Sequence, residues 1–278
     1  MERQDAYRSF FARLVTAHAG VPAGSKLEQA FASIPRENFV GPPPWRVFTP
    51  SGYLQAPSDD PTCLYQDVVV GLEKDGTLNN GQPSLHAFCL HSLALKEGER
   101  VIHVGAGTGY YTAMLADLVG STGSVDAYEV EQRLAERAAA NLADLPQVRI
   151  HHRSGAEGPL PECDVIYVNA GATSPLDVWL DALRPGGRLL FPLTPAQGAG
   201  GMLLIIRGAD ELYQARFLCP VLFVPCVGAR DEETEQKLAK AFRKGRYQKV
   251  KSLQRNDAPD GTCWCAGTGW WLSTAAIG

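Results

Sequence analysis

The sequence predicts an α/β fold with a doubly wound, mostly parallel sheet that ends in an antiparallel hairpin. From residue 101 onward, short apolar strands alternate with helical segments, which is the order typical of a parallel sheet. The last two predicted strands, 202–207 and about 214–224, flank the short turn Gly208-Ala209-Asp210-Glu211. A turn this short favours an antiparallel hairpin.

The first strand-helix-strand unit, residues 101–131, contains a glycine-rich turn. An apolar strand leads into Gly105-Ala106-Gly107-Thr108-Gly109, a helix follows, and the next strand, 124–129, ends in Glu129. Glycines let the backbone turn tightly and approach a ligand, and an acidic residue about 20 positions later can reach a ribose hydroxyl. The segment therefore predicts a nucleoside ligand, and an ordinary glycine-rich turn is the alternative.

The glycine spacing favours one class of nucleoside. A dinucleotide-binding turn has its third glycine three places after the second, where this chain has Tyr110. The GxGxG spacing instead favours S-adenosylmethionine, which has no pyrophosphate to place against a bare helix N-terminus. S-adenosylmethionine is therefore the predicted cofactor.

The following elements continue the alternation. A helix rich in Ala, Leu, Glu and Arg is predicted over 131–143, and another over about 176–183. Strands are predicted at 147–151, 164–169 and 188–193, the last after a Pro185-Gly186-Gly187 turn.

Ligands of open parallel sheets bind at the carboxyl ends of the strands. We expect the glycine turn to pass under the methionine part, Glu129 to accept from the ribose hydroxyls, and Ser154 to border the adenine. Alternatively, Ser154 only caps a helix or satisfies its own loop. The predicted cofactor contacts in these loops are Gly105, Ala106, Gly107, Gly109, Tyr110, Glu129, Val130, Ser154, Gly155 and Asn169.

Composition narrows the class of protein. At 278 residues and 45% hydrophobic content, the chain can bury one substantial core. A net charge of -4 without a dense Lys/Arg block argues against nucleic acid as the main partner, and the basic stretch 237–251 is interpreted as a solvated helix face. The sequence has no apolar run of the roughly 20 residues that span a bilayer, and its charged start does not resemble a signal peptide. We expect a soluble, cytoplasmic protein with reduced cysteines.

Six segments, in this order along the chain, resemble the protein-L-isoaspartate O-methyltransferase family. They are 30–40, Gly81-Gln82-Pro83-x-x-His86, 105–110, 153–158, 183–188 and 223–225, and the match runs from about Leu27 to Gly228. The resemblance implies the Rossmann-like class I methyltransferase fold and methyl transfer from S-adenosylmethionine to a carboxylate on an altered aspartyl residue of a protein or peptide. It adds Gly81, Gln82 and His86 to the predicted cofactor contacts.

This chemistry needs few reactive side chains. A carboxylate is ionised near neutral pH, so its attack on a sulfonium methyl needs no general base. In-line placement of the reactants can lower the activation free energy of the transfer by up to about 7 to 11 kcal/mol. We expect no metal: His151-His152 is at best half a metal site, and so is Cys263-x-Cys265.

The sequence departs from the family at one loop of three residues and at two single residues. Asn79-Asn80-Gly81 stands where the family has Thr-Ile-Ser, with Gly81 at the position of the catalytic serine. These three are the predicted catalytic residues, because the asparagine amides can donate to a carboxylate; the alternative is an ordinary turn. His103 and Ser154 replace two acids, and losing the second weakens the hold on adenine by about 0.5 to 1.5 kcal/mol.

Two further regions lie outside the resemblance. Residues 41–60, rich in proline, are predicted to form an irregular loop over the cleft, or to pack their aromatic residues on the surface. The tail from Arg230 begins as a charged helix and ends in a tryptophan-rich segment, 262–273. This segment should pack as a strand or cover on the core, or form a homodimer contact. The predicted parts are 1–96, with helices and covering loops, the cofactor-binding core 97–229, and the extension 230–278.

Three functions remain open at this stage. The chain is a carboxyl methyltransferase of isoaspartyl proteins, a relative redirected to a modified peptide or small natural product, or a cofactor-binding module that docks a partner. The divergent loop and the tail suit the second function, and the third would bind the cofactor without turnover.

Overall fold

The computed structural model describes residues 3–73 and 78–277. The chain divides into two compact units. Unit 1 comprises Met1–Glu99 and Ala106–His152, and unit 2 comprises Arg100–Gly105 and Arg153–Gly278. Among the described residues, no helix combines the length and apolar character that crossing a bilayer requires.

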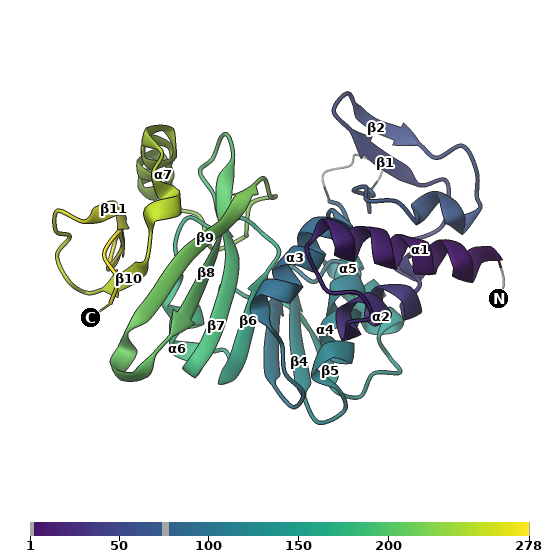
Figure 1. The fold of residues 1–278 in the computed structure, drawn as a ribbon, viewed down its shortest axis with the longest axis horizontal. Coiled ribbons are helices and arrows are strands. Elements are labelled where there is room, and N and C mark those ends of the chain that lie inside the picture. Colours follow the sequence, from purple (N-terminus) through teal and green to yellow (C-terminus); the bar gives the residue numbers. More distant parts are fainter. Residues whose placement is uncertain (1–2, 74–77, 278) are drawn as a thin grey trace. The chain divides into compact units, whose positions relative to one another are not determined.

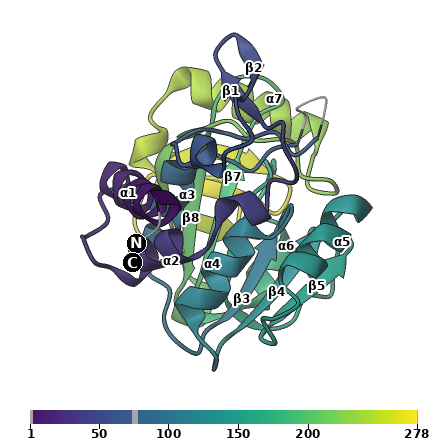
Figure 2. The same cartoon turned by 90° about the vertical axis from the view of Figure 1, so that its right-hand side faces the viewer.

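Unit 1 contains the N-terminal helices (Figure 1) and, by its residue range, most of the glycine turn. Its helices are α1 (Arg3–His18), α2 (Lys26–Ser33), α3 (Pro83–Leu93), α4 (Tyr110–Val119) and α5 (Gln132–Asn141), with 3-10 turns η1 (Arg36–Asn38) and η2 (Pro61–Leu64). Strand β4 (Ser124–Glu129) pairs in parallel with β5 (Val148–His152), and α4 and α5 pack beside them (Figure 2). The strand predicted at 124–129 and the helix that follows it are confirmed.

Aromatic side chains hold the helices of unit 1 together. Phe11 of α1 contacts Phe31 of α2 and Tyr65, with ring centroids 6.1 and 5.9 Å apart. Tyr110, the first residue of α4, contacts Phe31 and Phe39 at 6.4 and 5.4 Å. These contacts join α4, and the turn before it, to the N-terminal helices.

The predicted irregular loop over 41–60 is wrong in its centre. Strands β1 (Arg46–Thr49) and β2 (Gly52–Gln55) form an antiparallel hairpin there. Two backbone hydrogen bonds of 2.9 Å also tie β1 to residues 69–71. The prediction failed because these backbone partners, far along the chain, decide the pairing of strands this short.

The aromatic residues of this hairpin region differ in exposure. Trp45 is only 4% exposed and packs with Val40, Leu64 and Val70. Phe48, in contrast, is 49% exposed and contacts the ring of Tyr53 at 5.4 Å. Trp45 therefore anchors the hairpin in the core of unit 1, and Phe48 stays at its surface.

Unit 2 carries eight strands in the order β11-β12-β10-β9-β8-β7-β6-β3. They are β3 (Arg100–Val104), β6 (Cys163–Val168), β7 (Leu183–Leu193), β8 (Gly200–Arg207), β9 (Tyr213–Val221), β10 (Ser252–Arg255), β11 (Cys263–Gly267) and β12 (Trp270–Ser273). Strands β3, β6 and β7 are parallel, whereas β7, β8 and β9 are antiparallel, with η3 (Ala209–Glu211) between β8 and β9. The predicted parallel sheet with a closing hairpin is confirmed.

Strand β7 begins earlier than the predicted start at Arg188. Helix α6 (Asp177–Ala182) ends directly before it. The pairing with β6 shifts between Cys163 and Val165, which lie opposite Leu183 and Arg188. The predicted Pro-Gly-Gly turn is therefore an irregularity inside the strand, which lets the chain bulge while pairing continues on both sides.

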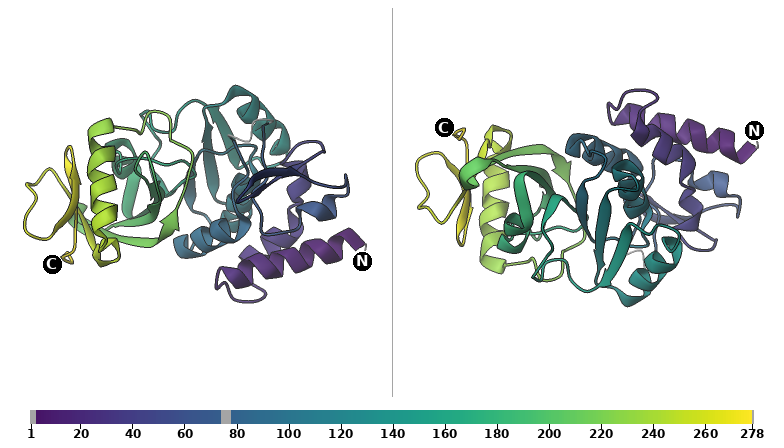
Figure 3. Two further views of the ribbon diagram at one scale, coloured as in Figure 1. Left: turned by 90° about the horizontal axis from the view of Figure 1, so that it is seen from above. Right: turned by 90° about the horizontal axis from the view of Figure 1, so that it is seen from below.

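The C-terminal extension completes unit 2. Helix α7 (Glu232–Lys244) begins where the Asp231 carboxylate accepts from the Thr234 backbone N–H at 2.8 Å, and it packs beside β11 (Figure 3). The turn η4 (Tyr247–Lys249) leads to β10. Trp270 and Trp271 are 6% and 5% exposed in β12, so the prediction that this segment packs as a strand is confirmed. The homodimer contact stays a prediction.

Candidate active site

Glu129 ends β4 in unit 1 with a carboxylate that the backbone holds in place. Its Oε2 accepts from the Gly107 N–H at 2.7 Å, and its Oε1 accepts from the Glu131 N–H at 3.0 Å. Burial raises the pKa of Glu129, and these backbone donors act in the opposite direction. Each carboxylate oxygen has a second acceptor position, so Glu129 can also accept from two hydroxyls.

The glycines of the turn meet different requirements. Gly109 has φ +94°, and a Cβ there would lie 2.6 Å from Leu142 Cδ1. Gly107 has φ +58° with more room, since the nearest atom to its Cβ position is Leu72 Cδ1 at 3.6 Å. Gly109 is thus favoured by both its backbone conformation and its packing, and Gly107 by the backbone conformation that aims its N–H at Glu129.

Two predicted contacts beside the turn are placed differently. Tyr110 is 1% exposed and its ring packs in the core of unit 1, which leaves only its backbone for a cofactor. Val130 is 39% exposed. The cofactor roles of Ala106, Gly109, Tyr110 and Val130 stay predictions.

The predicted acceptor loop, residues 79–81, lies over a buried arginine that the sequence analysis did not single out. Arg36 is 0% exposed, and its Nε donates to Asn80 Oδ1 at 3.1 Å. Its Nη atoms donate to the carbonyl oxygens of Leu64, Gln66, Val68 and Gly81 at 3.1, 3.2, 2.7 and 3.4 Å. Arg36 therefore ties the loop to the segment 64–68. The available signal was an arginine within the segment 30–40, which carries part of the family resemblance.

The two asparagines of the loop have different surroundings. Asn79 Oδ1 accepts from the Gly81 N–H at 2.9 Å, and a side-chain hydrogen bond links Asn79 to Tyr53. The Asn79 oxygen thus stabilises the backbone of its own loop, as in a turn. Asn80 is 7% exposed, and its oxygen must face Arg36 because a guanidinium can only donate. This geometry favours Asn80 over Asn79 as a donor to an acceptor.

Gly81 leaves no room for a side chain. It has φ +68°, and a Cβ there would lie 2.1 Å from His86 Nε2. His86 is 2% exposed and stacks on Tyr111 at a centroid distance of 3.7 Å, so its ring cannot easily move away. An imidazole therefore fills the space that a side chain at position 81 would take.

Asp67 fixes the start of α3. Its carboxylate accepts from the Ser84 N–H at 2.8 Å, from the Ser84 hydroxyl at 2.6 Å and from Gln82 Nε2 at 3.0 Å. The Gln82 side chain thus has a structural partner, and its predicted cofactor contact stays a prediction. Asp67 is a second residue that the sequence analysis missed.

In unit 2, Asn169 follows β6 with an unsatisfied acceptor. Its Nδ2 lies 2.7 Å from His103 Nε2, while its Oδ1 is buried and has no hydrogen-bond partner among the described residues. Burial lowers the pKa of His103 to about 3, so the ring is neutral and accepts from the amide. Gly105 packs against Asn169, since its Cβ position lies 3.4 Å from the Asn169 carbonyl carbon. A buried acceptor without a donor indicates a place for a ligand.

Ser154 satisfies its own loop. Its hydroxyl donates to the Val227 carbonyl at 2.7 Å and accepts from the Ala156 N–H at 3.1 Å. The carbonyl of Gly155 accepts from the Trp179 indole at 2.8 Å. These contacts match the alternative that Ser154 has a local structural role, and the adenine contacts of Ser154 and Gly155 stay predictions.

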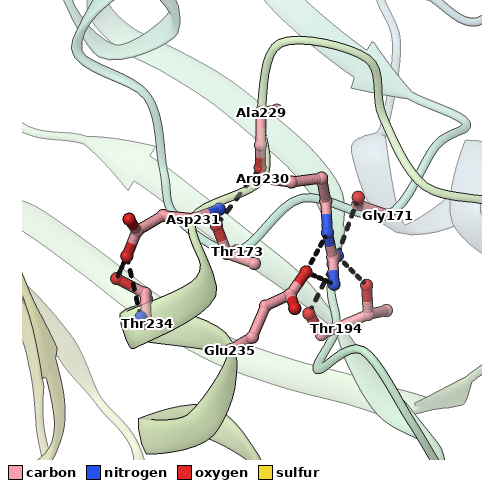
Figure 4. A network of polar contacts seen from close by, with 8 residues as sticks. All are labelled: Gly171, Thr173, Thr194, Ala229, Arg230, Asp231, Thr234 and Glu235. Atoms are coloured by element: carbon pink, nitrogen blue, oxygen red, sulfur yellow. Dashed lines mark hydrogen bonds and ion pairs between the residues drawn. The ribbon is translucent and has the colours of Figure 1, made fainter.

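An arginine network holds the loop after β6 (Figure 4). Arg230 donates to the carbonyls of Gly171 and Thr194, both at 3.0 Å, and to the Thr194 hydroxyl at 2.9 Å, while Glu235 accepts from its Nε at 2.7 Å. Thr173 accepts from the Asp231 N–H at 3.0 Å. The loop that begins with Asn169 is therefore fixed to the start of α7.

The described part of the chain holds no group of three or more His, Cys, Asp or Glu side chains arranged for a metal ion. His151 Nε2 lies 2.7 Å from Asp126 Oδ1 on neighbouring strands, which gives this histidine a structural partner.

Comparisons with known proteins agree on one family. The family model described as Protein-L-isoaspartate(D-aspartate) O-methyltransferase matches residues 14–231. A Brucella anthropi protein-L-isoaspartate O-methyltransferase is 34% identical over 215 residues, covering 76% of this chain and 89% of that protein. An Anaeromyxobacter dehalogenans protein of the same name is 40% identical over 150 residues, or 52% of this chain and 70% of that protein.

Two solved structures share the fold. One protein-L-isoaspartate O-methyltransferase superimposes with a TM-score of 0.67 at 24% identity, covering 85% of this chain and 69% of that chain. A Plasmodium falciparum structure of the same description, in complex with S-adenosyl-L-homocysteine, has a TM-score of 0.63 at 18% identity and covers 80% and 98%. They confirm the predicted α/β methyltransferase fold.

Proposed function

Because the chain belongs to the protein-L-isoaspartate(D-aspartate) O-methyltransferase family, we propose that it methylates an isoaspartyl carboxylate of a protein or peptide with S-adenosylmethionine. An acceptor oxygen attacks the methyl carbon while the carbon-sulfur bond breaks and its electron pair goes to sulfur. The products are a methyl ester and S-adenosylhomocysteine, and no proton is transferred. The protein's task is to place the two reactants in line.

The observation that carries the cofactor side is the doubly held Glu129. Its carboxylate is buried, pre-oriented by the N–H groups of Gly107 and Glu131, and retains acceptor positions on both oxygens. In this proposal, it accepts from the two ribose hydroxyls of S-adenosylmethionine. Charge-assisted bonds of this kind are the stronger hydrogen bonds of proteins.

Unit 2 offers a separate test of the fit. Asn169 Oδ1 is a buried acceptor that lacks a partner among the described residues, beside the backbone of Gly105. An ammonium group of a bound ligand would supply the missing donor. Neutral His103 orients the amide for this role, because its Nε2 accepts a hydrogen bond from Asn169 Nδ2.

The acceptor side is the loop 79–81. With its oxygen held by Arg36, Asn80 retains two amide N–H groups, which suit an anionic carboxylate. Because the carboxylate is ionised near neutral pH, the loop has to hold it but does not need to deprotonate it.

A methyl-transfer assay tests this function. An isoaspartyl peptide should gain one methyl ester for each S-adenosylhomocysteine formed, whereas the same peptide with aspartate should not. Equal rates on both peptides would contradict the proposed selectivity. Cofactor binding without transfer to any acceptor would instead support a binding module.

One observation favours a second candidate, a relative redirected to another carboxylate acceptor. The imidazole of His86 fills the space beside Gly81, so the wall of the acceptor site has a ring where a small side chain could otherwise stand. Transfer to a modified peptide or small carboxylate, with none to isoaspartyl peptide, would support this candidate.

A further inference from the structure

Arg36 is a buried cation surrounded by neutral acceptors. Four of its five hydrogen bonds go to backbone carbonyls and the fifth to the Asn80 amide. No ion pair with a carboxylate within 4.0 Å involves Arg36 in the described ranges 3–73 and 78–277. A charge removed from water without an opposite charge is expensive to bury, and arginine remains protonated.

The carboxylate of Asp67 contributes little direct neutralisation. Burial lowers the pKa of Arg36, and Asp67 is the weakest of the neighbouring groups that raise it through space. Its own oxygens are hydrogen-bonded to Ser84 and Gln82. A positive field therefore persists beneath the acceptor loop, where an anion would complete the charge balance.

The hydrogen bond from Arg36 to Asn80 lets the arginine charge act on the Asn80 amide. Because the guanidinium donates to Oδ1, the amide oxygen faces inward and the Nδ2 group lies at the other corner of the amide. A donor on the oxygen polarises the amide and strengthens its N–H groups as donors. The buried charge of Arg36 thus orients and strengthens the two N–H donors of Asn80.

We propose that Arg36 is a positioning residue that acts through Asn80 to select singly anionic carboxylate acceptors and to weaken binding of the neutral methyl ester product. This inference rests on the proposed function, because it assigns the acceptor side of that reaction. It implies that acceptor affinity depends on the charge of the acceptor, and that esterification itself promotes release.

The substitution Asn80→Asp separates this role from a structural one. Aspartate has the same shape, keeps the hydrogen bond to Arg36 and neutralises it, so a purely structural role predicts an equally active and equally stable protein. The proposal predicts a rise in KM for the acceptor of about tenfold or more, because both N–H donors are lost and a negative charge is added. Cofactor affinity and melting temperature should not fall.

Asn38→Asp is the matched control. Asn38 lies in the same 3-10 turn as Arg36 and is exposed, so this variant adds the same charge nearby without touching the loop. Its KM should stay within about twofold of wild type, the range of small surface effects. An equal rise in KM for both variants would overturn the assignment to Asn80.

Binding measurements make the test independent of turnover. Calorimetry on the protein loaded with S-adenosylhomocysteine should show an isoaspartyl peptide binding at least about tenfold more tightly than its methyl ester, and Asn80→Asp should abolish that difference. Equal wild-type affinity for acid and ester would overturn the inference even if the variant does not fold. Selective binding without methyl transfer would instead support the inference and reject the proposed function.

Discussion

Two buried charges of unit 1 are held in opposite ways. Glu129 is an anion whose oxygens accept from two backbone N–H groups, whereas Arg36 is a cation that donates to four backbone carbonyls and one side chain. Glu129 retains acceptor positions and can contact a ligand directly. Arg36 uses its donors within the fold and can act only through Asn80. One site is thus built for direct contact and the other for positioning.

Removing the cation should have the largest effect on stability. Arg36→Met would leave four carbonyls and the Asn80 amide oxygen without their donor, and each buried acceptor left unsatisfied costs about 1 to 3 kcal/mol. Thermal unfolding should show this loss. Arg13→Met, at an exposed ion pair of α1, is the control and should change stability by less than about 1 kcal/mol. A stable Arg36→Met protein would show that the network is dispensable.

Removing the anion should act on the cofactor more than on the fold. Glu129→Ala loses two charge-assisted ribose contacts of about 1.5 to 3 kcal/mol each, so affinity for S-adenosylmethionine should fall at least about tenfold. Calorimetry measures this directly. Glu131→Ala changes an exposed neighbour whose backbone N–H, and not its side chain, is hydrogen-bonded to Glu129, and it should bind normally. Wild-type affinity in Glu129→Ala would remove Glu129 from the cofactor site.

The acceptor loop can be perturbed at its glycine. Gly81→Ser places a side chain against His86, so it should lower acceptor turnover while cofactor affinity changes little. Gly24→Ser is the control, because Gly24 has a similar φ of +71° with nothing within 4 Å of its Cβ position. The double variant Gly81→Ser/His86→Ala should recover part of the lost rate. If Gly81→Ser instead raises isoaspartyl methylation, the native loop serves another acceptor.

The smallest expected effect concerns pH. Burial raises the pKa of Glu129 above its usual 4.5, so the folded protein binds that proton more tightly than the unfolded chain. Stability from this group is present below pH 4.5 and is lost as pH rises through the folded pKa. The free energy of unfolding of wild type, relative to that of Glu129→Gln, should therefore fall as pH rises through the folded pKa, as measured by thermal unfolding at a series of pH values. The same pH dependence of stability in wild type and in Glu129→Gln would contradict this account.

The fold was largely predictable because its signals are local. Periodic apolar segments and glycine turns indicate strands β4, β6 and β8 and the helix after β4, and Glu129 was located by its distance from the glycine turn. The hairpin β1–β2 was missed because its strands are short and depend on residues 69–71 for partners. The early start of β7 was missed because the Pro-Gly-Gly sequence, which is typical of a turn, lies within the strand at an irregularity of the pairing.

The acceptor side was harder to predict because its contacts are not local. Arg36 and Asn80 are 44 positions apart, and burial of the arginine becomes visible only in three dimensions. The sequence showed that Gly81 departs from the family, but not that His86 fills the adjacent space. Conversely, Ser154 is a predicted ligand contact whose hydroxyl already has partners in its own loop.

The central claim is that Glu129 serves the cofactor and the Arg36–Asn80 pair serves the acceptor. Its most direct test compares the calorimetric affinities of Asn80→Asp and Glu129→Ala for S-adenosylmethionine. The account predicts wild-type affinity for Asn80→Asp, because the Arg36–Asn80 pair serves the acceptor, and a loss of about tenfold or more for Glu129→Ala. An equal loss of cofactor affinity in both variants would contradict it, because the two buried charges would then serve one ligand.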